Sequence, residues 1–333
     1  MSVKIAVTGC GAWGRNLVRN FYNLESLYSI CDMDSETLCK ISEEYEGVKC
    51  ICDFNQLLQT DEVDGVVIAT PSHTHYPLTK KALEAGKHVY VEKPIATNSE
   101  EAKELMELAE EKGLALMVGH LLLYHPVVNR IKSLVKDDVL GKISYAQSDR
   151  LNVNFFRNDR SVLWDLAPHD LSMISYILNK SPLHVENASG CSVNNDGIVD
   201  ITHVDIEFED DIQAHISNSW IHPLKKVALI IRGTKATAVF DDSFQEKTFE
   251  LYDNTTTEKR LIECPDYIEI EPLKLECQHF LSCIKNKTKP RSDGLNGYET
   301  VKILEEAEKM MLGNQYGKIS NIKLASSRQK QRN

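Results

Sequence analysis

The sequence lacks the features of a membrane or secreted protein. It has no apolar run of about 18 residues, the length that a helix needs to cross a bilayer. Its first residues lead directly into a predicted strand, without the basic and apolar segments of a signal peptide. The nine cysteines are an odd number, and most have apolar neighbours, which is typical of reduced, buried thiols. We therefore expect a cytoplasmic protein without membrane contact.

An excess of positive charge is also missing. The 333 residues include 38 Lys and Arg against 49 Asp and Glu, a formal net charge of −11. Nucleic acid is therefore not an expected partner. Metal-binding patterns are incomplete, because Cys50 and Cys52 have no second pair and His73 and His75 have no Cys or acidic partner nearby. We predict no metal, and the length allows two domains.

The first 120 residues alternate between apolar runs and helical patterns. The runs are rich in Val and Ile and nearly continuous, as in parallel strands that are buried on both faces. The predicted strands are Val3–Gly9, Leu27–Asp32, Val48–Cys52, Gly65–Thr70, His88–Glu92 and Leu114–His120. The predicted helices are Gly14–Asn23, Ser35–Tyr45, Tyr76–Ala85 and Ser99–Lys112, the last capped by Ser99 and ended by Gly113. This alternation predicts an α/β fold with a doubly wound parallel sheet in residues 1–121.

After residue 121 the pattern changes to strands with short connections, which favours an antiparallel sheet. The predicted strands are 141–152, His184–Val193, Asp200–Phe208, Ile212–Trp220, Val227–Gly233, Ala236–Phe240 and Thr248–Tyr252. The predicted helices are Pro126–Val135, Pro168–Leu178, Leu273–Lys285 and Tyr298–Leu312. Residues 122–325 should therefore form an α+β domain with an open, mainly antiparallel sheet. Residues 326–333 are predicted to be a disordered polar tail.

A glycine-rich loop follows the first predicted strand in "VKIAVTGCGAWGRNL". Gly9, Gly11 and Gly14 give the pattern G-x-G-x-x-G between a strand and a helix. The first glycine permits a tight turn, the second lets the backbone approach a pyrophosphate, and the third lets helix and strand pack closely. The helix start supplies amide donors and partial positive charge. The loop predicts a dinucleotide-binding Rossmann domain, with Ala12 and Trp13 as further cofactor contacts.

Asp32 ends the second predicted strand and indicates which dinucleotide binds. A carboxylate at this position accepts hydrogen bonds from the adenosine ribose and repels a 2′-phosphate. Met33 rather than an arginine follows it. The sequence therefore favours NAD over NADP. The fourth strand ends at the same edge of the sheet, and the predicted cofactor contacts there are Thr70, Pro71, His73 and His75.

Glu92, Lys93 and Pro94 stand at the end of the fifth predicted strand, beside the expected position of a nicotinamide ring. Pro94 restricts Lys93 to extended geometry. A cation held there can bind a substrate hydroxyl and stabilise negative charge on its oxygen. Glu92 is expected to line the cofactor site. The ordinary alternative is a solvated lysine at a strand end.

A second group of polar residues occurs in "SVLWDLAPHDLSMISYIL". Asp165 and His169 are four residues apart, and a helix that begins near Ala167 would direct both into one cleft. Histidine is the side chain best suited to proton transfer near neutral pH. The preceding segment contains polar and basic residues that are candidate ligands for an anionic substrate, although surface arginines are common. These residues are Arg150, Asn152, Arg157 and Arg160.

Three motifs in this order resemble the glucose–fructose oxidoreductase, inositol 2-dehydrogenase and MocA family. They are the N-terminal glycine loop, Glu92-Lys93-Pro94, and Asp165-x-x-x-His169. The resemblance implies a Rossmann domain followed by a domain whose open sheet serves substrate binding and oligomer contacts. It also implies that Lys93 is the active-site lysine, His169 the acid/base and Asp165 a sugar ligand. One departure is Leu123, where many members carry an arginine.

The resemblance implies NAD-dependent oxidation of a secondary alcohol on a sugar ring. The "WDLAPHD" and "GHLLLYHP" segments are most similar to members that oxidise the 3-hydroxyl of UDP-N-acetylglucosamine or related UDP-sugars. The keto-sugar product is a potential substrate of an aminotransferase. The alternatives are an inositol or free-sugar dehydrogenase and a non-catalytic NAD-sensing protein. Apolar strands such as "VALIIRGT" and "ATAVF" predict a homodimer or homotetramer through an exposed sheet face.

Overall fold

The fold was analysed in a computed structural model, which describes residues 2–153, 160–193, 198–243, 248–256, 260–263 and 270–329. The chain forms two compact units. The first comprises residues 1–130 and 267–302, and the second comprises residues 131–266 and 303–333. The return of residues 267–302 to the first unit differs from the sequence pattern, which placed them with the second domain. Each unit is described by itself.

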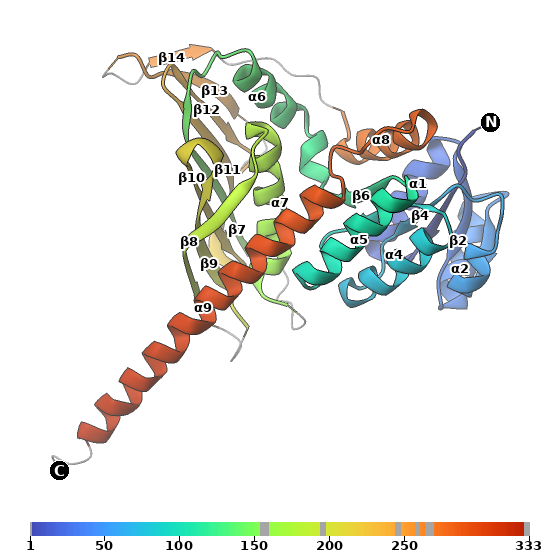
Figure 1. Cartoon of the computed structure of the whole chain (residues 1–333), viewed down its shortest axis with the longest axis horizontal. Helices are drawn as coiled ribbons and strands as arrows, with labels where there is room; N and C mark the ends of the chain where they lie inside the picture. The colour runs from blue at the N-terminus through green and yellow to red at the C-terminus, as the bar shows by residue number, and fades with distance from the viewer. Residues whose placement is uncertain are drawn as a thin grey trace. The chain divides into compact units, whose positions relative to one another are not determined.

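The first unit contains a six-stranded parallel sheet in the order β3-β2-β1-β4-β5-β6. Figure 1 labels β2, β4 and β6 of this sheet. Its strands are β1 (Ile5–Thr8), β2 (Leu27–Cys31), β3 (Lys49–Ile51), β4 (Gly65–Ile68), β5 (His88–Glu92) and β6 (Leu116–Gly119). Every residue of β1, β4 and β6 is buried, which explains their continuous apolar runs. The strand order reverses between β1 and β4, so the carboxyl ends of these strands border the crevice where such sheets bind ligands. The predicted doubly wound sheet is confirmed.

Helices cover both faces of this sheet. They are α1 (Ala12–Asn23), α2 (Ser35–Glu44), α3 (Phe54–Leu58), η1 (Ser72–Thr74), α4 (His75–Glu84), α5 (Ser99–Lys112), η2 (Leu121–Tyr124), α8 (Pro272–Asn286) and the start of α9 (Gly294–Gln329). The short helix α3 was not predicted. Asn98 rather than Ser99 caps α5, because its side chain accepts a hydrogen bond from the amide of Glu101 at 2.8 Å. Gly113 ends α5 in the left-handed conformation, as predicted (φ 64°).

The second unit is built on an eight-stranded sheet in the order β14-β13-β12-β11-β7-β10-β9-β8. Its strands are β7 (Ile143–Val153), β8 (Pro182–Cys191), β9 (Ile201–Phe208), β10 (Ile212–Ser219), β11 (Ile221–Gly233), β12 (Ala236–Asp241), β13 (Thr248–Asp253) and β14 (Arg260–Glu263). Among the described strands of this sheet, β7 and β10 are the one parallel pair, so the mainly antiparallel sheet is confirmed. Strand β14 was not predicted. Its helices are α6 (Pro126–Lys136), α7 (Val162–Leu178) and the remainder of α9, which continues to Gln329 in the segment predicted to be a tail.

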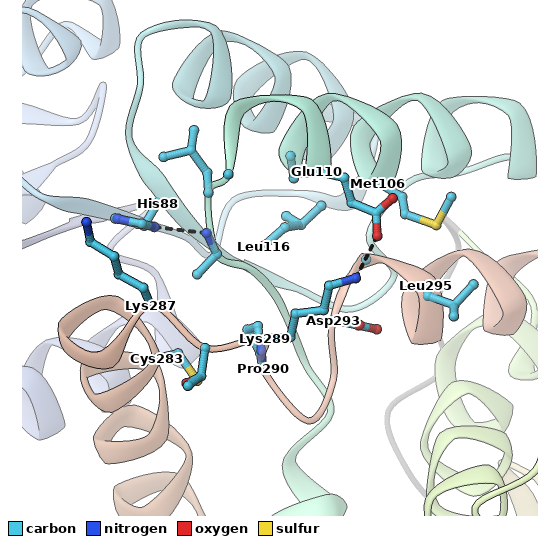
Figure 2. Close-up of a pocket in the computed structure, with 16 residues that line it drawn as sticks. His88, Met106, Glu110, Leu116, Cys283, Lys287, Lys289, Pro290, Asp293 and Leu295 are labelled. Carbon is cyan, nitrogen blue, oxygen red and sulfur yellow. Dashed lines mark hydrogen bonds and ion pairs between the residues drawn. The ribbon is translucent and has the colours of Figure 1, made fainter.

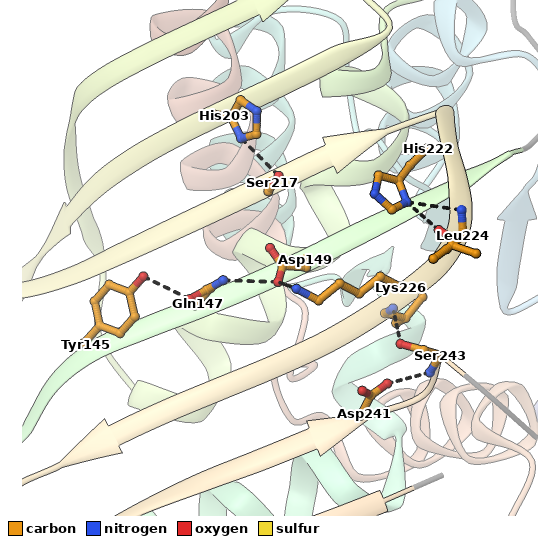
Figure 3. A network of polar contacts seen from close by, with 11 residues as sticks. Tyr145, Gln147, Asp149, His203, Ser217, His222, Leu224, Lys226, Asp241 and Ser243 are labelled. Atoms are coloured by element: carbon orange, nitrogen blue, oxygen red, sulfur yellow. Dashed lines mark hydrogen bonds and ion pairs between the residues drawn. The ribbon is translucent and has the colours of Figure 1, made fainter. Parts of the chain in front are cut away.

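The outer face of this sheet is mainly polar. Helix α7 packs on one face, against β7, β9 and β10. The opposite face carries a hydrogen-bonded series of side chains that includes Gln147, Asp149 and Lys226 (Figure 3). His203 and Ser217 form a second pair there. Apolar residues of the same strands, such as Leu229, are buried. The outer face is therefore mainly polar, although Ile230 and Val239 lie on it and are partly exposed, so strand alternation turns only part of the apolar side chains inward.

The membrane and cysteine predictions have different outcomes in the described residues. No helix among them is long and apolar enough to cross a membrane. The cysteines described are free thiols, but only Cys10, Cys31, Cys277 and Cys283 are buried. Cys50 and Cys52 are exposed, which corrects the prediction that they are buried. Strand β3 lies at the edge of its sheet and is therefore less covered than the apolar sequence around it suggested.

Candidate active site

The glycine loop joins β1 to α1. Gly9 has a positive φ of 86°, and a Cβ atom there would lie 2.7 Å from the carbonyl carbon of Ala69. A Cβ at Gly14 would lie 1.9 Å from the carbonyl oxygen of Gly9. These two glycines are therefore required by the turn and by close packing. A Cβ at Gly11 would meet nothing within 4 Å, so its backbone borders open space at the start of α1. Ala12 and Trp13 are exposed beside it.

Asp32 lies directly after β2 and is fixed by backbone amides. One carboxylate oxygen accepts a hydrogen bond from the amide of Cys10 at 2.7 Å, and the other accepts one from the amide of Asp34 at 3.0 Å. Burial, and then the charge of Asp32, raises the pKa of the Cys10 thiol to about 12, so this thiol stays neutral. The open backbone at Gly11, the helix start and the oriented carboxylate suit a dinucleotide.

The loop after β4 contains predicted cofactor contacts that differ in their surroundings. Pro71 and His73 are exposed, and the Thr70 hydroxyl shares a 2.6 Å hydrogen bond with that of Thr74. His75 is only 2% exposed. Its Nδ1 lies 2.7 Å from the carbonyl oxygen of Pro94, and its Nε2 lies 2.8 Å from that of Thr70. The predicted contact between His75 and a cofactor is therefore replaced by a structural one, which joins the loops after β4 and β5.

Glu92 is the last residue of β5, and Lys93 and Pro94 follow it at the carboxyl edge of the sheet. The Lys93–Pro94 peptide bond is cis, Pro94 is buried, and Lys93 is partly exposed. Glu92 accepts hydrogen bonds from the indole nitrogen of Trp13 at 2.6 Å and from the hydroxyl of Tyr90 at 3.1 Å. Burial raises the pKa of Glu92, although Trp13, Lys93 and Tyr90 each favour its charged form. Glu92 therefore links the end of β5, next to Lys93, to the glycine loop.

His120 was not predicted to belong to the site. It follows β6, next to the strand that carries Lys93, and is 1% exposed. Burial, and then the positive charge of Lys93, lowers the pKa of His120 to about 3. It is therefore a neutral imidazole at physiological pH and does not add a second cation beside Lys93. The one sign of this in the sequence was that His120 ends the predicted strand Leu114–His120. That sign is weak, because histidines without a function are common at strand ends.

Asp165 and His169 lie on the same helix in the second unit. Helix α7 begins at Val162, not near Ala167, so the predicted start is wrong. Pro168 suggested a helix start, but here it occupies an interior position, where it lacks one backbone donor. Asp165 is in the first turn and His169 is one turn further on, so both lie on one face. Both side chains are partly exposed, as their predicted role requires.

Asp170, which was not predicted, anchors this helix to the sheet. It is fully buried, and one of its oxygens accepts hydrogen bonds from the Ser148 hydroxyl at 2.8 Å and from Nε and Nη2 of Arg150 at 3.1 and 3.0 Å. Its other oxygen accepts one from Asn218 at 2.8 Å. Arg150 is thus held on the face that carries α7, and Asn152 follows on the same face by strand alternation. Arg157 lies outside the described residues.

Two other candidate sites lie away from these residues. A cavity of about 280 Å³ in the first unit borders the amino ends of β5 and β6, and its lining includes His88, Leu116 and Lys287 (Figure 2). It is at the opposite edge of the sheet from the glycine loop. In the second unit, His184, Glu186 and Glu207 could hold a metal ion, but such groups on exposed strands are common without one. Neither position includes a predicted catalytic residue.

The first unit thus has the fold of a nucleotide-binding α/β protein, with a glycine loop, the Asp32 carboxylate and Lys93 at one edge of its sheet. Two family models match the sequence: the oxidoreductase family with an NAD-binding Rossmann fold over residues 3–120, and the GFO/IDH/MocA C-terminal domain over residues 128–239. Together they span more than half of the chain. The chain therefore belongs to the GFO/IDH/MocA family of oxidoreductases, as the motifs indicated.

Relatives within this family differ in substrate. UDP-N-acetylglucosamine 3-dehydrogenase from Acidithiobacillus ferrooxidans is 28% identical over 58% of this chain and 60% of the relative. Its solved structure superposes with a TM-score of 0.83 at 24% identity, covering 93% of this chain and 98% of that one. The NAD-dependent scyllo-inositol 2-dehydrogenase of Bacillus subtilis is 25% identical over 86% of this chain and 88% of the relative. A 3-ketoreductase from Actinomadura kijaniata, solved with NADP, has a TM-score of 0.77 at 16% identity, covering 93% and 98%.

Proposed function

We propose that this protein is an NAD-dependent dehydrogenase that oxidises a secondary alcohol of a sugar ring to a ketone. The sugar is that of a UDP-N-acetyl sugar such as UDP-N-acetylglucosamine, and the oxidised group is its 3-hydroxyl. The observation that carries the proposal is the pairing of Asp165 and His169 on one partly exposed helix face, in a chain that also has Lys93 at the dinucleotide edge of its sheet. Similarity to a UDP-N-acetylglucosamine 3-dehydrogenase supports the substrate.

Asp32 supports NAD rather than NADP as the cofactor. Its two oxygens are oriented by backbone amides beside the glycine loop, where a ribose would present its hydroxyls. A 2′-phosphate would bring negative charge next to this carboxylate. The exposed residue that follows is Met33, which offers no positive charge. A structurally similar 3-ketoreductase was solved with NADP, so the proposed preference of this chain rests on Asp32.

The chain's own residues would handle the proton and the developing charge. A bound nicotinamide cofactor supplies the hydride acceptor. His169 accepts the hydroxyl proton through an imidazole nitrogen. The Lys93 ammonium of the first unit would stabilise negative charge that develops on the substrate oxygen, and Asp165 of the second unit would accept a hydrogen bond from a substrate hydroxyl. The alcohol thus loses one proton and one hydride, and its carbon–oxygen single bond becomes the double bond of a ketone.

Arg150 is the candidate ligand for the diphosphate of a nucleotide sugar. Nε and Nη2 of its guanidinium donate to the buried Asp170, and Nη1 would serve the substrate. Its side chain is 18% exposed, so the charge is only partly hydrated. Arg157 and Asn152 complete the proposed substrate contacts. An arginine held in one orientation by a carboxylate recognises phosphate at low entropic cost.

An inositol dehydrogenase is the second candidate. It is favoured by the inositol-oxidising relative, whose similarity extends over 86% of this chain. Inositol carries no phosphate, so this function would leave Arg150 without a substrate contact. A non-catalytic NAD-sensing protein is less well supported, because both Lys93 and His169 are present. A keto-sugar product would suit a downstream aminotransferase, and the enzyme is proposed to act in the cytoplasm as a homodimer or homotetramer.

A cofactor-reduction screen tests the proposal. The purified chain is mixed with NAD or NADP and with UDP-N-acetylglucosamine, its uronic acid, myo-inositol or free hexoses, and the absorbance of the reduced cofactor is recorded. Reduction of NAD with a UDP-sugar is expected, and reduction with myo-inositol alone would establish the second candidate. Absence of reduction with every substrate, while NAD still binds, would support the non-catalytic function instead.

A further inference from the structure

A carboxyl group without hydrogen bonds lies in the core of the first unit. Glu276 on α8 is fully buried, and neither of its side-chain oxygens has a hydrogen-bond partner in the structure. An ionised carboxylate in such a position is strongly disfavoured, because the neighbouring Tyr90 hydroxyl already donates its one hydrogen to Glu92 and so does not replace the lost water. Its length and position within an apolar helix gave no sign of this in the sequence. Glu276 takes no part in the mechanism above.

The packing of α8 places Glu276 beside the end of β5. The ring of Phe280 meets that of Tyr90 edge to face, with centroids 5.9 Å apart. One turn earlier on α8 is Glu276, and two residues later on β5 is Glu92. Four helix residues rise about 6 Å and two strand residues about 6.6 Å, so Glu276 lies beside Glu92 as Phe280 lies beside Tyr90. Cys283 and His88, at the other end, line the same cavity, which fixes the antiparallel direction.

The hydrogen bonds of Glu92 come from two donors that each have one hydrogen. The Trp13 indole donates at 2.6 Å and the Tyr90 hydroxyl at 3.1 Å, both to Oε1. Gly119 lies opposite Glu92 on β6, and a Cβ there would be 2.9 Å from the Glu92 carboxylate. The missing side chain leaves room for this carboxylate. If Glu276 were ionised, it would compete for the single hydrogen of Tyr90 and repel Glu92.

The described groups that shift the pKa of Glu276 include no cation. Burial, and then Glu92, raises its pKa well above the ordinary value, and the Tyr90 hydroxyl offsets this only in part. Burial likewise raises the pKa of Tyr90 on β5, of Tyr124 on η2 and of Cys277 on the same helix, so all three stay neutral. Two cations lie further out: Lys93, which favours a charged Glu92, and Arg291, which lies 5.4 Å from the Tyr124 ring.

We propose that Glu276 is a protonated carboxylic acid and that Glu92 holds the single negative charge of the pair. With that charge Glu92 holds the indole of Trp13 at the start of α1 and so positions the glycine loop. Glu92 is thus a positioning residue. Because Glu276 stays protonated, the negative charge of the pair remains on Glu92. The step to cofactor binding rests on the proposed function, whereas the protonation of Glu276 does not.

Infrared spectroscopy of the cofactor-free protein tests the protonation directly. The wild type at neutral pH is expected to show the carbonyl band of a protonated carboxylic acid that is lost in Glu276→Gln and kept in Glu92→Gln. Glu276→Met, an apolar change of similar length, should remove the same band and serves if the amide variant is unstable. A spectrum in which neither Glu276 variant loses such a band would overturn the proposal.

Tryptophan fluorescence and NAD titration test the positioning role. Trp13→Phe identifies the emission of Trp13 against that of the other tryptophans. Glu92→Gln should shift this emission and raise the NAD dissociation constant about tenfold, the scale of a lost charge-assisted hydrogen bond. Glu276→Gln, the matched control, should leave both near the wild-type values. Glu92→Gln should have no further effect in a Trp13→Phe background.

An unshifted Trp13 emission in Glu92→Gln, or additive losses in the double variant, would refute the positioning role. A wild type that does not bind NAD would instead remove the proposed function. The infrared and emission results would still decide this inference, because both are measured without cofactor.

Discussion

Asp170→Asn should destabilise the second unit more than any other single amide substitution on α7. The substitution keeps the shape of the side chain but removes its charge. Asp170 is fully buried and accepts hydrogen bonds from Ser148, from Asn218 and twice from Arg150. An amide nitrogen cannot accept, so at least one of these donors loses its partner. Arg150 also loses its counter-charge.

The size of the effect follows from the exposure of Arg150. Removing one partner of a fully buried ion pair costs about 3–5 kcal/mol. The Arg150 side chain keeps 18% of its surface, so water recovers part of this, and we expect a loss of about 2–4 kcal/mol in the free energy of unfolding. Urea unfolding in a Trp13→Phe background measures it, because Trp164 and Trp220 then report the second unit.

The control is Asp165→Asn, a change of the same kind on the same helix. Asp165 is partly exposed, and we expect a change within about 0.5 kcal/mol. In the double variant Asp170→Asn/Arg150→Met, part of the lost stability should return, since no unpaired guanidinium remains. A loss below about 1 kcal/mol for Asp170→Asn alone would contradict the anchoring role that we assign to this residue.

Three further predictions concern the site. Asp32→Ala should weaken NAD binding and reduce discrimination against NADP, as measured by titration with both cofactors; an unchanged preference would remove the ribose role of Asp32. His169→Ala should lower turnover strongly, with partial recovery at high pH if the residue removes a proton, and a pH–rate profile identical to the wild type would argue against it. The pKa of His120 is about 3 in the folded protein and about 6.5 in the unfolded chain, so burial of His120 destabilises the protein as pH falls between these values. His120→Phe should therefore lose less stability than the wild type between pH 7 and pH 5 in urea titrations. An equal loss in both proteins would contradict the neutral, buried state assigned to His120.

Much of the first unit was predictable because parallel strands buried on both faces leave continuous apolar runs. The positions of Asp32, Thr70 and Lys93 at strand ends followed from that pattern, and the glycine loop added its own spacing. The start of α7 was not predictable, since Pro168 resembles a first-turn residue although it lies inside the helix. The error moved Asp165 out of the helix that in fact carries it.

The residues that were missed are those whose role depends on distant partners. Asp170 looks like any polar residue in an amphipathic helix until β7 and β10 bring Arg150 and Asn218 to it. His75 appeared to be a cofactor contact until Pro94 and Thr70 were found at its two nitrogens. The mainly polar outer face of the large sheet was not predicted, because an apolar strand sequence does not show which face of the sheet a helix will cover.

The central claim is that Lys93 stabilises charge on the reacting oxygen and does not hold the cofactor phosphates. The most direct test is the turnover of Lys93→Met with the UDP-sugar, measured together with its NAD affinity. Turnover should fall roughly a hundredfold or more, the effect of removing a group that stabilises an oxyanion. NAD affinity should stay near the wild-type value, because the backbone at Gly9, Gly11 and Gly14 serves the phosphates. Near-normal turnover in this variant would contradict the account, and a matching loss of NAD affinity would assign Lys93 to cofactor binding instead.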